Sequence, residues 1–499
     1  MGLNLASIVT ESAARVPDNP AVRLGGTALT YAELDERSAR LATLLREQGL
    51  EPGDRVGVML PNVLEFPVAY YGALRAGCVV VPMNVLLKRR EIAFYLEDSG
   101  SKLLLAWHGF GAEARDGAAD AGVELIEVEP ASFAALLTAR EPTPGLVDTA
   151  EDDTAVILYT SGTTGKPKGA ELTHANLFRN ADVSSRTTSE IAAGDVVFGG
   201  LPLFHSFGQT VSMNASLMVG ACLTLVPKFD PAEALETMQR DRVTHFYGVP
   251  TMYGALLHHP DRESYDTSTL RTCITGGASM PVEVLRGFEE AFGAIVLEGY
   301  GLSETSPVSS SNHPDRERKP GSIGTPLEGV EMRVVDEDDN EVAQGEVGEI
   351  VIRGHNIMKG YWQRPEATEE AMRGGWFHSG DMARVDEEGY FYIVDRKKDL
   401  IIRGGYNVYP REVEEVLYEH PKIREAAVVG VPHDQWGEEI GAAVVLHDGE
   451  QLDPAEVSVY VKERIDAYKY PRLVWFVEEL PKGPTGKILK REIEPPASA

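Results

Sequence analysis

Cysteine is scarce in this sequence: its 499 residues include only Cys78, Cys222 and Cys273. The number is odd, and the three cysteines lie far apart in apolar segments, which indicates buried thiols rather than disulfides or a zinc site. A metal ion would then have to bind oxygen ligands. The sequence also has no apolar run of the ~18 residues that a membrane helix requires, and it does not begin with a basic region followed by an apolar one. We therefore expect no membrane span, no signal peptide and a cytoplasmic protein.

Basic residues are in the minority, since 47 Lys and Arg face 77 Asp and Glu, for a formal net charge of −30. This excess argues against nucleic acid or an anionic membrane as a general partner. A small polyanionic ligand would need a local basic site. The length exceeds what one hydrophobic core usually holds, so we expect two or three domains.

Short β-branched runs alternate with helical patterns from residue 20 to 300, which is typical of βαβ units in a mostly parallel sheet. Residues 53–61 (GDRVGVMLP) are echoed by residues 194–202 (GDVVFGGLP), and an apolar strand-like segment follows each. We interpret these as two related α/β halves. Thr30, with Glu33 three residues later, predicts a capped helix start. Alternating residues and acidic turns between 330 and 361 predict a small β subdomain.

The predicted fold class is therefore α/β. It comprises a large N-terminal domain of two related α/β halves with mostly parallel sheets plus a small β subdomain, and a small mobile α+β C-terminal domain.

The segment 159–169 (YTSGTTGKPKG) directly follows an apolar strand-like run at 155–158. Glycines let backbone N–H groups approach an anion, and hydroxyls and lysines add donors and positive charge. This pattern predicts a phosphate-binding loop for a nucleotide. It is not a Walker A loop, because that motif would require glycine at Thr160 and a hydroxyl residue at Pro167. Taken alone, the segment could also be a mobile surface loop.

This loop resembles the signature loop of the adenylate-forming enzymes, the superfamily of acyl- and aryl-CoA synthetases, adenylation domains and firefly luciferase. Further motifs follow in the order of that family: YGLSE at 300–304, SGD at 379–381, DRKKDLI at 395–401 with GGYN at 404–407, and PKGPTGK at 481–487. The resemblance covers nearly the whole chain and is greatest to fatty acyl-CoA synthetases.

The resemblance implies a reaction in which a carboxylate attacks the α-phosphorus of ATP, pyrophosphate leaves, and a thiol then displaces AMP from the acyl-adenylate. Such chemistry needs positioning and charge neutralisation. The resemblance implies Mg²⁺ as the cofactor, and ATP and CoA as the co-substrates. It also implies an AMP-forming fatty acid–CoA ligase, with a medium- or long-chain fatty acid as substrate.

The family motifs also imply site residues. The nucleotide site comprises Thr160, Ser161, Gly162, Thr163, Thr164, Gly165, Lys168, Gly276, Gly277, Ala278, Gly299, Tyr300, Gly301, Ser303, Glu304, Asp381, Arg396 and Lys487. Thr160 and Glu304 would hold the metal ion. Lys487 would be the catalytic lysine that bridges the carboxylate and the α-phosphate, and His205 would act at the mouth of the acyl pocket.

The same resemblance places the acyl pocket at His205, Phe207, Gly208, Gly277 and Gly301. Gly404 and Gly405 would line a tunnel for the pantetheine arm of CoA. Lys398 would be the hinge between an N-terminal ATP- and acyl-binding domain, residues 1–397, and a mobile C-terminal domain, residues 398–499.

Several alternatives remain open from the sequence. The acceptor could be the phosphopantetheine of an acyl carrier protein, or the chain could bind an acyl-adenylate without catalysis, since fold does not imply function. A luciferase-like oxygenase would share the same motifs. Outside its motif, Lys487 would be an ordinary solvated lysine, Asp381 a turn carboxylate and His205 a core histidine. The oligomeric state is open, as is acetylation of Lys487.

Overall fold

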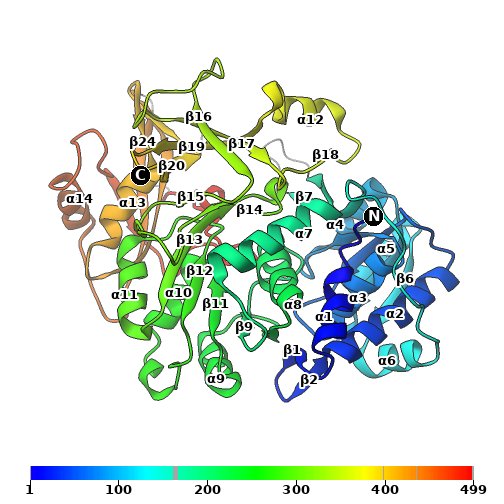
Figure 1. Cartoon of the computed structure of the whole chain (residues 1–499). Coiled ribbons are helices and arrows are strands. Elements are labelled where there is room, and N and C mark those ends of the chain that lie inside the picture. The colour runs from blue at the N-terminus through cyan, green and yellow to red at the C-terminus, as the bar shows by residue number, and fades with distance from the viewer. Residues whose placement is uncertain (1, 161–166, 397, 434, 497–499) are drawn as a thin grey trace.

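The computed structural model describes residues 2–160, 167–396, 398–433 and 435–496. It is an α/β protein in which a large N-terminal part carries a smaller C-terminal domain on one side (Figure 1). The predicted α/β class, with a large N-terminal part and a small C-terminal domain, is confirmed, and the mobility of that domain stays a prediction.

The largest sheet has nine strands in the order β15-β14-β13-β12-β11-β9-β10-β1-β2. Its six central strands, from β13 to β1, are parallel, and antiparallel strands close both edges. The strands are β1 (Pro20–Leu24), β2 (Thr27–Thr30), β9 (Val196–Gly199), β10 (Cys222–Leu225), β11 (His245–Gly248), β12 (Thr272–Thr275), β13 (Ile295–Gly301), β14 (Val308–Ser311) and β15 (Thr325–Pro326).

The second sheet has seven strands in the order β18-β8-β7-β4-β3-β5-β6, parallel from β7 to β6. Its strands are β3 (Arg55–Met59), β4 (Val79–Pro82), β5 (Ser101–Trp107), β6 (Glu124–Val128), β7 (Thr154–Thr160), β8 (Lys168–Thr173) and β18 (Gly360–Tyr361). β18 joins this sheet by pairing with β8. The sequence pattern assigned Tyr361 to the β subdomain, but this residue lies in the seven-stranded sheet instead.

Helices cover these two sheets. They are α1 (Ser7–Arg15), α2 (Tyr31–Glu47), α3 (Glu65–Arg75), α4 (Arg89–Ser99), α5 (Gly111–Ala121), α6 (Pro130–Thr138), α7 (His174–Val183), α8 (Ala215–Val219), α9 (Pro231–Asp241), α10 (Pro250–Leu257), α11 (Val282–Phe292) and α12 (Pro365–Ala371). Thr30 caps α2 through a capping box with Glu33, as predicted. One continuous hydrophobic core includes residues of both sheets, so the two halves fold against each other.

The sequence repeat corresponds to two matching units. In one, β3 leads through α3 to its parallel neighbour β4, and in the other β9 leads to its parallel neighbour β10. After β9 the chain forms a π-helix, Phe207–Asn214, which continues directly as α8. The three cysteines are buried and free, as expected.

The β subdomain is an antiparallel sheet in the order β16-β17-β19-β20. Its strands are β16 (Val330–Val335), β17 (Gly348–Gly354), β19 (Phe377–Val385) and β20 (Phe391–Arg396). The segment predicted as the β subdomain, residues 330–361, contributes β16 and β17, and the sheet extends beyond it to β19 and β20.

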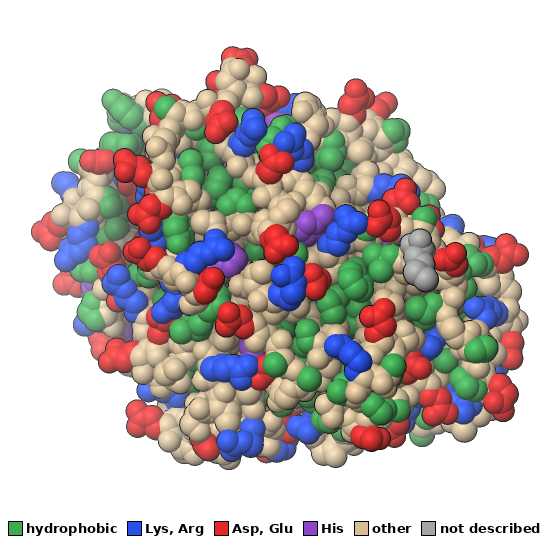
Figure 2. Space-filling view, viewed as in Figure 1, with side chains coloured by type: hydrophobic (Ala, Val, Ile, Leu, Met, Phe, Trp, Pro, Cys, Tyr) green, Lys and Arg blue, Asp and Glu red, His purple; other side chains and the backbone are tan. Residues whose placement is uncertain are grey.

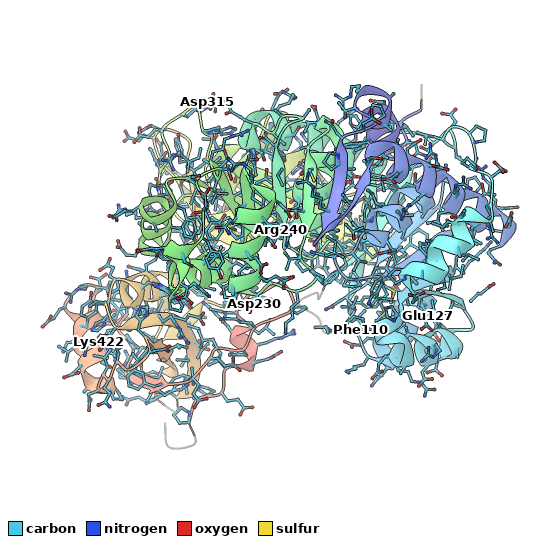
Figure 3. The ribbon with its side chains drawn as sticks, turned by 90° about the horizontal axis from the view of Figure 1, so that it is seen from below. Phe110, Glu127, Asp230, Arg240, Asp315 and Lys422 are labelled. Atoms are coloured by element: carbon cyan, nitrogen blue, oxygen red, sulfur yellow. The ribbon has the colours of Figure 1, made fainter. Side chains whose placement is uncertain are left out.

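The C-terminal domain has its own hydrophobic core. It contains β21 (Ile401–Arg403), β22 (Tyr406–Val408), α13 (Pro410–Tyr418), β23 (Ile423–His433), β24 (Gly437–Leu446), α14 (Pro454–Lys462) and β25 (Leu473–Phe476). Seen from below, this domain, marked by Lys422, lies away from the half that carries Phe110 and Glu127 (Figure 3).

Acidic and basic side chains are interspersed over the face shown in Figure 2. Within the described part of the chain, no helix is long and apolar enough to cross a membrane.

Candidate active site

A cavity of about 530 Å³ lies between the large part of the protein and the C-terminal domain. Its wall includes eight residues that the motifs predict for the nucleotide site: Gly277, Ala278, Gly299, Tyr300, Gly301, Asp381, Arg396 and Lys487. They come from the segment after β12, from β13, β19 and β20, and from the segment that precedes the C-terminus. The fold therefore gathers into one cavity residues that are up to 210 positions apart, from Gly277 to Lys487.

Tyr300, Asp381 and Arg396 form a connected polar group on this wall. The Tyr300 hydroxyl donates to Asp381 Oδ2 at 2.6 Å, and Arg396 Nε lies 3.4 Å from Asp381 Oδ1. Asp381 and Arg396 face each other across the β19–β20 ladder. Burial, followed by the Asp381 charge, raises the pKa of Tyr300 well above its usual value, so its hydroxyl remains a donor. Tyr300 and Arg396 thus orient the Asp381 carboxylate through its two oxygens, and Asp381 lines the cavity.

Lys487 reaches this group from a loop of the C-terminal domain. The loop is anchored to the large part, because the Thr251 hydroxyl at the start of α10 donates to the Gly486 carbonyl oxygen at 2.8 Å. Gly486 has φ +78°, and a Cβ there would lie 3.0 Å from Val249 Cγ2, so glycine is required. Burial, and then the Arg396 guanidinium, lower the pKa of Lys487 to about 8.

His205 follows β9 and precedes the π-helix 207–214. Burial, and then the charge of Lys487, lower the pKa of His205 to about 4, so its ring is neutral at pH 7. The Phe207 N–H donates to His205 Nδ1 at 3.4 Å, which places the ring proton on Nε2. His205 is therefore a neutral group close enough to Lys487 to feel its charge.

The predicted phosphate loop joins β7 and β8, two antiparallel strands in which Thr160 faces Lys168. Ser161, Gly162, Thr163, Thr164 and Gly165 lie outside the described residues. At the base of the loop, Thr160 Oγ1 lies 3.4 Å from both Glu304 Oε1 and the Lys168 carbonyl oxygen. Lys168 Nζ lies 5.2 Å from the centre of the Tyr361 ring. The loop base is thus fixed next to the predicted metal-binding carboxylate.

Glu304 is buried, at 8% exposure, in a short 3₁₀ turn, Ser303–Thr305, just after β13. Its Oε1 accepts a hydrogen bond from the Tyr361 hydroxyl at 2.9 Å, and its carbonyl oxygen accepts one from the Met358 N–H at 2.8 Å. A carboxylate beside the Thr160 hydroxyl suits Mg²⁺, which commonly binds one or two carboxylates together with substrate phosphates. Among the described residues, no group of three or more His, Cys, Asp or Glu could form a metal cage by itself.

The predicted glycines differ in what they do. A Cβ on Gly276 would lie 3.2 Å from the Gly299 carbonyl oxygen and 3.4 Å from the Phe207 ring, so a flat surface is kept between them. At Gly301 and Gly208 a Cβ would collide with backbone oxygens, at 1.8 Å from Pro307 and 2.3 Å from Pro202. Gly301 and Gly208 are therefore required for packing.

Gly404 and Gly405 form the turn between β21 and β22, with φ +58° and +87°. The Gly404 N–H donates to the Trp436 carbonyl oxygen at 2.8 Å. Neither glycine is among the described residues that line the cavity, and their predicted contact with CoA stays a prediction. Lys398 is exposed in the turn after β20, between the two parts of the chain.

Sequence reasoning missed three residues that support the site. Tyr361 binds Glu304, Thr251 anchors the Lys487 loop, and Arg411 on α13 ties the C-terminal domain to the large part. None lies in a motif that marks chemistry. Of the three, only Arg411 could have been noticed from the sequence, because it closely follows the GGYN motif at 404–407.

Two family models match the chain: "AMP-binding enzyme" over residues 9–362 and "AMP-binding enzyme C-terminal domain" over residues 412–487. Among curated proteins, a long-chain-fatty-acid–CoA ligase of Bacillus subtilis is 40% identical over 98% of this chain and 94% of its own length. A feruloyl-CoA synthase of an Amycolatopsis species is 42% identical over 96% of both chains.

Among solved structures, ATP-bound MatB from Rhodopseudomonas palustris is 35% identical, with a TM-score of 0.92 over 98% of both chains. These matches span both parts of the chain and agree with the cavity geometry. The chain therefore belongs to the AMP-binding enzyme family, within which it is an AMP-forming acid–CoA ligase.

Proposed function

We propose that this protein activates a medium- or long-chain fatty acid with ATP, through an acyl-AMP intermediate, and transfers the acyl group to the thiol of CoA. The observation that carries the proposal is the insertion of Lys487 into a cavity that also contains Tyr300, Asp381 and Arg396. A lysine ammonium facing an oriented carboxylate and a guanidinium suits a reaction in which negative charge moves between a carboxylate and a phosphate.

In this proposal the adenine lies in the slot between the 276–278 segment and the ring of Tyr300. Asp381 accepts hydrogen bonds from the ribose hydroxyls, and Arg396 contacts the ribose or the phosphates. Ser303 contacts the α-phosphate, while Thr160 and the loop that follows it, with Lys168, hold the β- and γ-phosphates. A Mg²⁺ ion bound by Glu304 and Thr160 would neutralise phosphate charge.

Lys487 acts at the reacting atoms. It bridges the attacking carboxylate and the α-phosphate as the carboxylate–phosphorus bond forms and the bond to pyrophosphate breaks. Loss of one such donor commonly costs ~3–4 kcal/mol, about a hundred- to a thousandfold in rate. His205, neutral and close to Lys487, borders the acid at the mouth of the acyl pocket with Phe207.

The composition of residues 196–229, which include the predicted acyl-pocket residues His205, Phe207 and Gly208, favours a substrate acid with an apolar chain. No Asp or Glu occurs between Val196 and Phe229, so no carboxylate is present there to bind the ammonium group of an amino acid. Relatives named for long-chain fatty acids and for ferulate both match this chain. A closed apolar pocket would discriminate by about fourfold per methylene, at ~0.8 kcal/mol each, so a chain-length series is the informative comparison.

For the second half of the reaction, we propose that residues 398–499 move as a unit about Lys398. This would withdraw Lys487 and bring Gly404 and Gly405 to the pantetheine arm of CoA. Replacing Lys398 with proline fixes φ at the hinge and should block thioester formation while leaving ATP–pyrophosphate exchange. Thioester synthesis by Lys398→Pro at the wild-type rate would place the hinge elsewhere.

The proposal is tested by incubating the protein with Mg²⁺, ATP and a panel of fatty, aryl and amino acids, with and without CoA. Pyrophosphate and the acyl products are measured, the latter by mass spectrometry. Acyl-CoA from a narrow range of fatty-acid chain lengths is the expected result. Turnover of ferulate in preference to every fatty acid would contradict the substrate assignment, and acyl-AMP without acyl-CoA would redirect the acceptor to a carrier protein.

A further inference from the structure

Asp381 reaches the cavity from an irregularity in the sheet of the β subdomain. Glu349 faces Met382 and Val351 faces His378, so Ile350 alone lies opposite the three residues 379–381. This bulge re-aims the strand, as bulges near functional sites commonly do. Gly380 at its centre has φ +73°, and a Cβ placed on it would meet no atom within 4 Å. Packing therefore does not fix this glycine.

Hydrogen bonds fix the bulge instead. Ser379 Oγ donates to the Ile350 carbonyl oxygen at 2.7 Å and accepts from the Asp381 N–H at 3.1 Å. The Gly380 N–H donates to Glu349 Oε1 at 3.0 Å. Because a glycine is conformationally free, the bond to Glu349 restricts the peptide between Ser379 and Gly380, one residue before Asp381.

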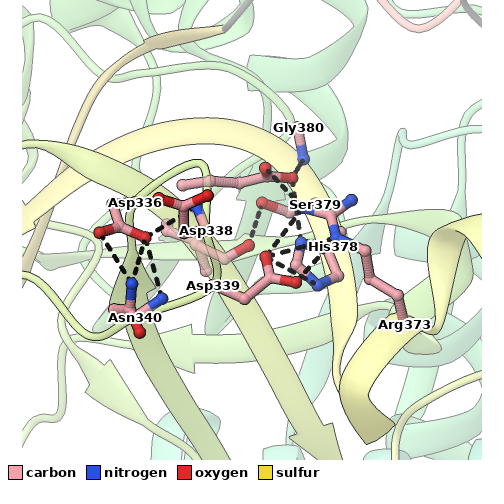
Figure 4. Close-up of polar contacts among 10 residues, drawn as sticks. Asp336, Asp338, Asp339, Asn340, Arg373, His378, Ser379 and Gly380 are labelled. Carbon is pink, nitrogen blue, oxygen red and sulfur yellow. Dashed lines mark hydrogen bonds and ion pairs between the residues drawn. The ribbon is translucent and has the colours of Figure 1, made fainter.

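Glu349 is itself held in place. It is 8% exposed, with Arg373 Nη2 at 3.8 Å from its Oε2 and His378 Nδ1 at 3.7 Å from its Oε1. Arg373 also pairs with Asp339 at 3.0 Å, which ties the carboxylate to the β16–β17 turn (Figure 4). A chain of charged contacts thus runs from the surface of the β subdomain to the backbone of the Asp381 turn.

We infer that Glu349 is a positioning residue for nucleotide recognition, which it influences by fixing the Gly380 peptide and so the direction of the Asp381 carboxylate. Glu349 is not among the described residues that line the cavity, so it acts on a bound nucleotide only through Asp381. The inference rests on the proposed function, because it requires Asp381 to bind the ribose hydroxyls. Glu349 is then a second carboxylate on which ribose binding depends, although its side chain does not line the cavity.

The test compares two nucleotides. Wild type, Glu349→Ala and Glu349→Gln are assayed for pyrophosphate release with ATP and with 2′,3′-dideoxy-ATP, which has no ribose hydroxyl for Asp381 to bind. We expect Glu349→Ala to raise the KM for ATP about tenfold, and Glu349→Gln about threefold, as for a weakened hydrogen bond to a charged group. With 2′,3′-dideoxy-ATP, both variants should stay within about twofold of wild type.

Two controls separate positioning from general damage. Glu331→Gln removes a carboxylate of the same sheet that pairs with Arg353 at 2.8 Å on the surface, and its KM for ATP should be unchanged. In an Asp381→Asn background, Glu349→Ala should have no further effect, because the residue through which it acts is already altered. If Glu349→Ala does not fold, the comparison of ATP with 2′,3′-dideoxy-ATP is made with Glu349→Gln alone.

An equal loss with ATP and with 2′,3′-dideoxy-ATP would overturn the inference and make Glu349 a structural residue. Unchanged kinetics of both variants would overturn it as well. Failure of the proposed function looks different, since wild type itself would then release no pyrophosphate from ATP with any acid.

Discussion

The hydroxyl of Tyr300 lies 2.6 Å from Asp381 Oδ2 and joins β13 to β19. This hydrogen bond connects the residue proposed to stack on adenine with the residue proposed to bind ribose. One side chain thereby fixes the spacing of two nucleotide contacts that come from different sheets.

Replacing Tyr300 with phenylalanine keeps the ring and removes this hydrogen bond. We expect the KM for ATP to rise about fivefold, since one hydrogen bond to a charged group contributes roughly 1 kcal/mol or more, with little change in kcat. Tyr392→Phe is a matched control, because its hydroxyl lies 3.2 Å from Asp386 Oδ2, and neither residue is among those described as lining the cavity. A kcat effect without a KM effect in Tyr300→Phe would argue against a ribose-binding role for Asp381.

The pKa of Lys487 gives a pH dependence. Burial lowers this pKa from 10.5 to about 8, so in the free enzyme the ammonium is present below pH 8 and lost above it. The kcat/KM for acyl-adenylate formation, which reports the free enzyme, should therefore fall as the pH rises through about 8.

Lys487→Arg tests whether that decline belongs to Lys487. A guanidinium stays charged throughout the range, so this slower variant should keep its residual activity above pH 8. A decline at the same pH in Lys487→Arg would assign the titration to another group.

Glu304 is expected to control the magnesium requirement. Because Glu304→Gln removes the only carboxylate of the proposed metal site, the Mg²⁺ concentration for half-maximal activity should rise by more than about tenfold. Tyr361→Phe, which removes only the hydroxyl that donates to Glu304, should raise it by a few-fold at most. Titration of pyrophosphate release with MgCl₂ measures both, and an unchanged requirement in Glu304→Gln would remove this residue from the metal site.

Arg411 should support adenylation by holding the C-terminal domain in place. Its guanidinium donates to the Ile393 carbonyl oxygen at 2.7 Å and to the Gly321 carbonyl oxygen at 3.1 Å, and so holds α13 against the large part of the protein. We expect Arg411→Ala to slow acyl-adenylate formation about tenfold, because Lys487 is then held less firmly in the cavity.

The control for Arg411 is Arg464→Ala, which removes a more exposed arginine paired with Glu463 in the same domain. It should leave adenylation unchanged. Equal rates for Arg411→Ala and wild type would mean that the contact of Thr251 with Gly486 is sufficient to place Lys487.

Much of the nucleotide site could be predicted because its residues stand in short motifs with fixed spacing. Tyr300, Asp381, Arg396 and Lys487 meet in one cavity although the sequence separates them widely. The predicted capping of a helix by Thr30 is likewise confirmed, at the start of α2.

The supporting residues could not be predicted, since their roles arise from tertiary contacts. Tyr361 meets Glu304 only because β18 pairs with β8 in the second sheet. Glu349 meets Gly380 only through a shift of strand register, which no local pattern in the sequence encodes. The π-helix at 207–214 could not be predicted either, because an ordinary α-helix gives a similar hydrophobic spacing.

The most direct test of the account separates the two half-reactions in Lys487→Ala. Acyl-AMP formation is measured by mass spectrometry without CoA, and thioester formation is measured from supplied acyl-AMP with CoA. We expect the first rate to fall about a hundred- to a thousandfold and the second to stay near wild type. An equal loss in both half-reactions would contradict the assignment of Lys487 to the adenylation step.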